Sequence, residues 1–201
     1  MGLRSFLRDR RERAQEKSER GRLGGWRRSV VAGLDGRVLD VGAGMGFSLP
    51  LLGAAESVVA LEPDREHIQR ARRRVARAPA KSWLVAGDAQ ALPFRDGAFD
   101  SALGTLVFCT IPDPERAFRE VQRAVKPGGA VHLLEHVRVR NPILAGLQDL
   151  ITPLTRALAG GCHQNRPTVE TARRSGLRIE AVRPHLRGYI VEIEARVAYE
   201  T

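Results

Sequence analysis

The stretch Val38-Leu39-Asp40-Val41-Gly42-Ala43-Gly44-Met45-Gly46-Phe47 is an apolar run that ends in a glycine-rich turn. Because glycine has no Cβ, the three glycines let the turn adopt positive φ angles and let a ligand reach backbone N–H groups. The pattern predicts a cofactor site at the end of a strand. Two details argue against a pyrophosphate and hence against an NAD-linked enzyme. Asp40 places a carboxylate just before the turn, and Phe47 stands where a dinucleotide-binding fingerprint has its third glycine. A cationic ligand fits better.

Acidic residues also follow the next two apolar runs. Ser57-Val58-Val59-Ala60-Leu61 ends in Glu62, where a carboxylate can accept hydrogen bonds from both hydroxyl groups of a ribose. Asp88 lies in Gly87-Asp88-Ala89, after a third run. A tight turn without a ligand would explain the glycines alone. One nucleoside that carries a positive charge explains the glycines and the acids together.

The segment from Leu39 to Phe47, Glu62 and Gly87-Asp88-Ala89 together resemble the class I methyltransferases that use S-adenosylmethionine (SAM). This resemblance implies that SAM is the cofactor, with its methionine portion on Asp40 and the turn, its ribose on Glu62 and its adenine on Asp88 and Ala89. The expected cofactor-binding residues are Asp40, Gly42, Ala43, Gly44, Gly46, Phe47, Glu62, Pro63, Asp88, Ala89, Thr105 and Leu106.

From Arg37 onward, short apolar runs alternate with helical patterns, which is typical of a doubly wound α/β fold. We expect a single Rossmann-like, seven-stranded, mostly parallel sheet with an antiparallel last strand, plus an N-terminal helix. The expected strands are 37–41, 57–61, 82–86, 99–103, 130–134, 177–182 and 189–197. The expected helices include 65–78, 142–159 and 168–175.

The formal net charge of +10 is concentrated at the N-terminus, because residues 1–28 carry ten basic residues against four acids. We divide the chain into a basic helical arm, residues 1–25, and a methyltransferase domain, residues 26–201. Gly21, Gly24 and Gly25 are expected to end the helix of the arm. Three roles are open for it: a lid over the cofactor, an interfacial helix on anionic lipid, or a solvated helix. The rest of the chain is only mildly basic, so a nucleic-acid groove is not indicated.

Cys109 and Cys162 make no disulfide framework, and no CxxC pair indicates zinc, so we expect no metal and a reducing, cytoplasmic location. Cys109 is expected to be a buried apolar thiol. The N-terminus lacks the apolar core of a signal peptide, and polar residues interrupt the most apolar later stretch, Ile143 to Leu158. Membrane contact is therefore expected only at the periphery, through the basic arm.

Motifs in the C-terminal half of the chain resemble one particular group of methyltransferases. The match to the animal methyltransferase-like group that methylates small alkyl thiols runs from Trp26 to Glu192. The segments that carry it are Thr105-Leu106-Val107-Phe108-Cys109, Gly128-Gly129, Leu134-Glu135-His136-Val137, Gly160-Gly161-Cys162 and Pro184-His185-Leu186-Arg187-Gly188-Tyr189. This resemblance implies a small, fairly apolar acceptor, with an alkyl thiol as the leading candidate. The N-terminus departs from the group, because a basic helix replaces the apolar membrane anchor of the animal proteins.

Other activities stay open at this point. Bacterial phospholipid N-methyltransferases and quinone C-methyltransferases share the core pattern, and a non-catalytic SAM-binding module is an alternative of another class. Motifs of nucleic-acid base methylation are missing from the sequence after the fourth expected strand. His136 follows the fifth expected strand and is the candidate catalytic base, because a thiol near its ordinary pKa must lose a proton. The expected substrate pocket consists of Phe108, His136, Leu147 and Ile151.

Overall fold

The computed structural model describes residues 13–158 and 161–199. Residues 13–20 are helical. The elements that follow alternate between helices and strands as the sequence predicts. They are α2 (Arg22–Val31), β1 (Gly36–Val41), η1 (Leu49–Leu51), β2 (Ala55–Glu62), α3 (Arg65–Val75), β3 (Lys81–Ala86), β4 (Phe99–Thr105), α4 (Pro114–Ala124), β5 (Val125–His136), α5 (Pro142–Leu158), α6 (Thr168–Arg174), β6 (Leu177–His185), η2 (Leu186–Gly188) and β7 (Ile190–Val197).

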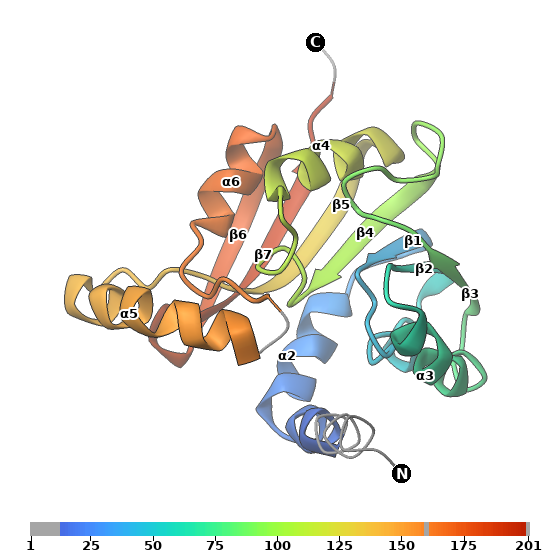
Figure 1. Ribbon diagram of the computed structural model, residues 1–201. Helices are drawn as coiled ribbons and strands as arrows, with labels where there is room; N and C mark the ends of the chain where they lie inside the picture. Colours follow the sequence, from blue (N-terminus) through green and yellow to red (C-terminus); the bar gives the residue numbers. More distant parts are fainter. Residues whose placement is uncertain (1–12, 159–160, 200–201) are drawn as a thin grey trace.

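The seven strands form one sheet in the order β3-β2-β1-β4-β5-β7-β6 (Figure 1). All neighbours from β3 to β5 pair in parallel, whereas β7 runs antiparallel to both β5 and β6. The predicted fold class is confirmed, including the antiparallel last strand. The strand order reverses between β1 and β4, and open α/β sheets bind their ligands outside the carboxyl ends of strands at such a point.

Side chains of β1 alternate between two cores, one on each face of the sheet. Leu39 and Val41 belong to the core that includes Phe118 of α4, while Val38 packs in the core that includes Val30 of α2. This alternation follows from the two-residue period of a strand. Both faces of β1 are therefore covered, and its carboxyl end, with Asp40 and the glycine-rich turn, is held firmly in place.

The N-terminal helices differ in detail from the prediction. Helix α2 runs through Gly24 and Gly25, so the predicted boundary after residue 25 falls inside it. A Cβ at Gly24 would lie 1.8 Å from the carbonyl oxygen of Glu19. Gly24 therefore permits a close crossing with the helical segment 13–20 and does not end a helix. The division into an arm and a domain stays a prediction. Within the described ranges, no helix is both long and apolar enough to cross a membrane.

Candidate functional site

The glycine-rich turn between β1 and η1 has the backbone that its sequence predicts. Gly42, Gly44 and Gly46 have φ angles of 59°, 57° and 78°, in the left-handed region that favours glycine. A Cβ on Gly42 would lie 2.1 Å from Cγ2 of Val107, whereas a Cβ on Gly44 would meet no atom within 4 Å. The turn thus packs directly against the segment after β4 at Gly42, and at Gly44 it faces open space where a ligand can touch the backbone.

Asp40 is fully buried at the end of β1, and neither carboxylate oxygen has a hydrogen-bond partner in the described part of the chain. Burial raises the pKa of Asp40 to about 7, nearby Glu62 adds to the rise, and Arg27 opposes it. An unpartnered buried carboxylate is costly, and a cation would relieve that cost. The ammonium group of a methionine moiety fits this requirement.

Glu62, at the end of β2, lies beside the turn. Its carboxylate accepts hydrogen bonds from the backbone N–H of Gly44 at 2.8 Å and of Asp64 at 3.0 Å. Nδ1 of His67 lies 3.3 Å from the same carboxylate, and this hydrogen bond raises the pKa of His67. The sequence predicts that Glu62 contacts the ribose of the cofactor. His67 is not among the predicted site residues. The structure makes His67 a partner that orients Glu62.

The remaining predicted adenine contacts lie after β3. Asp88 is exposed and accepts hydrogen bonds from the backbone and side-chain amides of Gln90, whereas Ala89 is buried. Pro63 is exposed next to Glu62. Because β1, β2 and β3 are parallel neighbours, their carboxyl ends meet at one edge of the sheet. The adenine role of Asp88 and Ala89 stays a prediction.

Arg27 of α2 is a site residue that the sequence analysis missed. Its buried guanidinium donates to Thr105 Oγ1 at 2.5 Å and to Ser48 Oγ at 2.9 Å. It therefore joins the end of β4 to the segment after the glycine-rich turn. The sequence does hold a signal that Arg27 is buried. Val30 and Val31 follow it at i+3 and i+4, so this arginine lies on the apolar face of the helix. Leu106, next to Thr105, has a φ of 55°, a backbone region that non-glycine residues rarely occupy.

The helical segment 13–20 forms two ion pairs with later parts of the chain, and one of them reaches the glycine-rich turn. Glu19 accepts two hydrogen bonds from Arg27, at 2.8 and 2.9 Å. Glu16 accepts one at 3.0 Å from Arg74, which also donates to the carbonyl of Met45 at 3.0 Å. The guanidinium of Arg74 lies 3.9 Å from the centre of the Phe47 ring. These contacts attach the segment beside the turn, and the three roles left open by the sequence stay predictions.

Cys109, His136 and Cys162 come together at the carboxyl ends of β4 and β5. The two sulfurs are 3.3 Å apart, and Nδ1 of His136 lies 3.6 Å from Cys162 Sγ and 3.8 Å from Cys109 Sγ. The hydrogen bond shared with Cys109 lowers the pKa of Cys162 to about 5, with His136 adding to the effect, while that of Cys109 is raised. No local pattern in the sequence predicts this cluster, because its three residues are far apart in the chain.

The loop that carries Cys109 is held from two sides. The buried carboxylate of Glu135 accepts hydrogen bonds from the backbone N–H groups of Val107, Phe108 and Cys109, at 2.8, 2.9 and 3.2 Å. Burial raises the pKa of Glu135 to about 7, and these three bonds oppose the rise. Arg166 donates to the carbonyls of Phe108 and Ile111 at 2.8 and 2.5 Å. The cluster therefore sits on a fixed backbone.

His136 lies in the cysteine cluster, and the pocket role expected for Phe108, Leu147 and Ile151 stays a prediction. Phe108 is 1% exposed and stacks on Phe118 with ring centres 4.0 Å apart, so its ring belongs to the core. Leu147 and Ile151 of α5 are 54% and 40% exposed. Helix α5 turns a polar side inward, with Gln148 and Thr152 buried. Buried Gln148 donates to the carbonyls of Val137 and Gln164 and accepts from the N–H of Val139.

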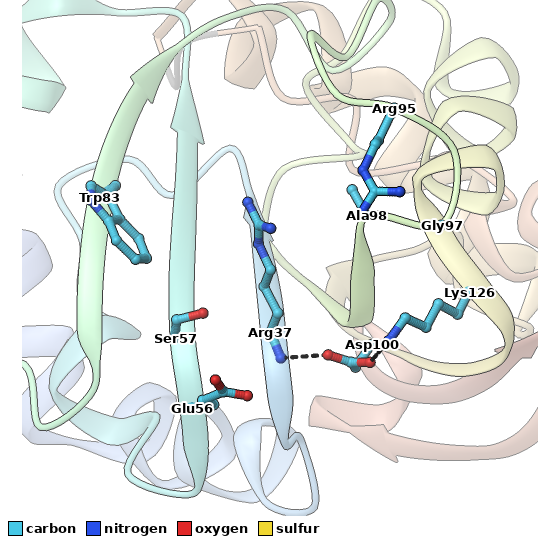
Figure 2. A pocket seen from close by; sticks show the side chains of 9 residues that line it. All are labelled: Arg37, Glu56, Ser57, Trp83, Arg95, Gly97, Ala98, Asp100 and Lys126. Carbon is cyan, nitrogen blue, oxygen red and sulfur yellow. Dashed lines mark hydrogen bonds and ion pairs between the residues drawn. The ribbon is translucent and has the colours of Figure 1, made fainter.

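A pocket of about 420 Å³ lies at the opposite edge of the sheet, near the amino ends of β1 and β4 (Figure 2). Its carboxylate Asp100 accepts hydrogen bonds from the backbone N–H of Arg37 and the ammonium of Lys126, at 2.8 and 2.5 Å. Asp100 is thus already paired within the described chain, and the pocket lies at the opposite edge from the glycine-rich turn. The candidate site is therefore the edge that holds Asp40, Glu62 and His136.

This fold and this edge define a SAM-dependent methyltransferase, and comparison with known proteins agrees. Residues 39–133 match the family model of the methyltransferase domain, from β1 and its glycine-rich turn to β5. The matched region is just under half of the chain. The enzyme class and the cofactor predicted from the sequence are confirmed. The unpartnered carboxylate of Asp40 and the open face of Gly44 fit that cofactor.

Several relatives act on different acceptors. The chain is 36% identical over 114 residues to a phosphatidylethanolamine N-methyltransferase of Cereibacter sphaeroides, covering 55% of this chain and 56% of the relative. It is 28% identical over 179 residues to human thiol S-methyltransferase TMT1A, covering 80% and 73%. A demethylmenaquinone methyltransferase of Renibacterium salmoninarum is 36% identical over 115 residues, covering 55% and 47%. The chain thus spans about half the length of the two bacterial relatives.

A solved structure shows the same fold. The S-adenosylmethionine dependent methyltransferase of Mesorhizobium loti superposes with a TM-score of 0.68 over 86% of this chain and 96% of that chain, at 20% identity. At 20% sequence identity, this similarity shows only that the two chains share a fold. The resemblance to the small-thiol group, made from sequence segments, is confirmed by the match to the human enzyme.

Proposed function

We propose that this chain transfers the methyl group of SAM to a small, fairly apolar acceptor, and that an alkyl thiol is the leading acceptor. One observation carries the choice of a thiol. Cys162 and Tyr189, from two of the segments on which the resemblance to thiol methyltransferases rests, lie beside His136, which belongs to a third. Nδ1 of His136 lies 3.6 Å from Cys162 Sγ, and the ring centre of His136 lies 5.0 Å from that of Tyr189.

The pattern of relatives supports the same choice. The human thiol enzyme aligns over 179 residues, whereas the phospholipid and quinone enzymes align over 114 and 115. The longer alignment must include much of the C-terminal half. That half supplies His136, Cys162 and Tyr189, the residues at the proposed acceptor site.

When bound, SAM supplies a methyl group on a sulfonium, which is a good leaving group. Asp40 would pair with its ammonium and Glu62 with its ribose. The acceptor sulfur forms a bond to the methyl carbon as the bond from that carbon to the sulfonium breaks. The chain contributes mainly by alignment and by exclusion of water, worth up to about 7–11 kcal/mol. We expect His136, which lies beside Cys162, to hold the acceptor or to take its proton.

Incubation of the purified protein with SAM labelled in the methyl group tests this function. The panel contains small alkyl thiols, lipid and small amines, and quinols, with mass-spectrometric identification of each product. We expect thioether formation from a small thiol. Fast methylation of a lipid amine or a quinol, with no product from any thiol, would refute the thiol and leave the cofactor site standing.

A phospholipid amine is the second candidate, because α5 turns its apolar side outward. Ile143, Leu150 and Leu154 are 81%, 77% and 63% exposed and follow one another at helical spacing. A lipid surface would cover such a face, and the net charge of +10 favours an anionic one. In the same panel, methylation that requires vesicles containing phosphatidylethanolamine and that fails in a Leu150→Ser variant would favour this candidate.

A further inference from the structure

We propose that Cys109, His136 and Cys162 form a three-ligand site for a divalent metal ion, best matched by Zn²⁺, whose fourth position takes the sulfur of the acceptor thiol. The fourth-position role rests on the thiol function proposed above, whereas the metal site stands without it. This departs from the sequence expectation of no metal. That expectation depended on cysteines close in sequence, while this cluster joins the loop after β4, the end of β5 and the segment after α5.

The three ligand atoms have nearly the spacing of a tetrahedral site. With Zn–S of about 2.3 Å and Zn–N of about 2.0–2.1 Å, two sulfurs lie about 3.8 Å apart and a sulfur and a nitrogen about 3.6 Å apart. In the protein the two sulfurs are 3.3 Å apart, and Nδ1 of His136 is 3.6 and 3.8 Å from them. A sulfur movement of about half an ångström would complete the geometry.

The chemistry of the donors and their surroundings also fits. Thiolate and imidazole are ligands that zinc prefers over the oxygen ligands of magnesium or calcium. Both cysteines are buried, and two thiolates this close together repel each other unless a cation lies between them. The bonds from Glu135 and Arg166 to the loop around Cys109 fix one ligand before an ion binds. Metal sites depend on such outer contacts for affinity.

A set of two cysteines and one histidine leaves a fourth position open, as in catalytic zinc sites; structural sites use four protein ligands. A thiol bound there loses its proton to solvent and becomes a thiolate at neutral pH. Its sulfur then bonds to the methyl carbon while the carbon–sulfonium bond breaks, which yields a thioether and S-adenosylhomocysteine. His136 would act as a metal ligand and not as the base. His163, whose buried Nδ1 has no partner in the described chain, is the residue to test as a closing fourth ligand.

Metal binding is tested directly on the full chain, reduced and treated with a chelator, by titration with Co²⁺ and then Zn²⁺. We expect one equivalent to bind, with thiolate-to-cobalt charge-transfer absorption that Zn²⁺ abolishes. Metal binding should weaken at least about 100-fold in each of the variants Cys109→Ser, Cys162→Ser and His136→Gln. Such a loss exceeds the loss of about 10- to 100-fold that is typical when a residue that only hydrogen-bonds to a ligand is removed. His132→Gln is the matched control, since His132 lies on the same strand but contacts the carbonyl of Val30.

Each outcome decides one part of the proposal. Binding well below one equivalent, or equal binding by the Cys162→Ser protein, overturns the site. Ethanethiol should change the visible spectrum of the cobalt protein. If ethanethiol leaves the spectrum of the wild-type cobalt protein unchanged but changes that of the His163→Ala protein, His163 is a fourth ligand. The site is then a closed structural site, and the open fourth position is overturned. If ethanethiol binds to cobalt or zinc but is not methylated, the thiol function fails and the site stands. Full methylation of thiols by metal-free protein overturns the role of the ion and leaves the function standing.

Discussion

The affinity for SAM should depend on pH through Asp40. Burial raises the pKa of this carboxyl from 3.8 to about 7 in the ligand-free protein. Its carboxylate can pair with the ammonium of the cofactor only when ionised, so binding below about pH 7 must release the proton. Each pH unit below 7 should therefore weaken binding about tenfold, or about 1.4 kcal/mol, and the dissociation constant should level off above about pH 8.

The same group sets a trend in stability. Because the pKa of Asp40 is higher in the folded protein than in the unfolded chain, its contribution to stability is complete below pH 3.8 and is lost as the pH rises to about 7. The difference between the two pKa values corresponds to about 4 kcal/mol at 1.36 kcal/mol per pH unit. Asp40→Asn should raise the free energy of unfolding at about pH 8 by no more than this, because the buried amide also lacks partners.

Isothermal titration calorimetry between about pH 6 and pH 8 checks the prediction, with S-adenosylhomocysteine as a second ligand because it keeps the ammonium and lacks the sulfonium charge. Both ligands should show the same slope, and the Asp40→Asn protein should bind both weakly at every pH. A flat affinity in the wild-type protein would refute the reasoning. So would tight binding of either ligand by Asp40→Asn at about pH 8.

Four further variants test the same edge of the sheet and the arm. Gly44→Ala should leave a folded protein that binds SAM at least about tenfold more weakly. Gly42→Ala should also lower the melting temperature without cofactor, because its Cβ would overlap Val107; equal melting temperatures would contradict this. Glu62→Ala should reduce the thermal shift caused by SAM, and an undiminished shift would remove Glu62 from the ribose site. Deletion of residues 1–20 should leave the circular dichroism spectrum folded but speed cofactor release, whereas unchanged turnover and vesicle binding would refute both the lid and the membrane role.

Most of the fold follows from the sequence because its signals are local. An apolar run such as Val38 to Val41 packs between two helical layers, so its extent marks a strand with little ambiguity. Glycines are harder to interpret. Gly42 marks a turn through its own φ angle, but Gly24 lies inside a helix and its purpose depends on the carbonyl of Glu19, which only the folded structure brings near.

The acceptor side could not be predicted to the same degree. Cofactor residues follow directly on strand ends, so the sheet topology fixes their neighbourhood. Cys162 reaches His136 through a loop whose path no local pattern encodes. Leu147 and Ile151 are expected at the pocket because their segment follows the carboxyl end of the fifth strand. Which side of α5 faces inward depends on the hydrogen bonds of Gln148 with the backbone of Val137 and Val139, and no local pattern predicts these bonds.

The contact between Gly42 and Val107 has a kinetic consequence. Val107 lies two residues before Cys109, so the donor half and the acceptor half of the site share one packed surface. Binding of SAM at the glycine-rich turn should therefore fix the conformation of the loop that carries Cys109 before the acceptor binds. The enzyme should follow a compulsory order, in which SAM adds first and S-adenosylhomocysteine leaves last. Steady-state inhibition by S-adenosylhomocysteine should then be competitive against SAM and noncompetitive against the acceptor.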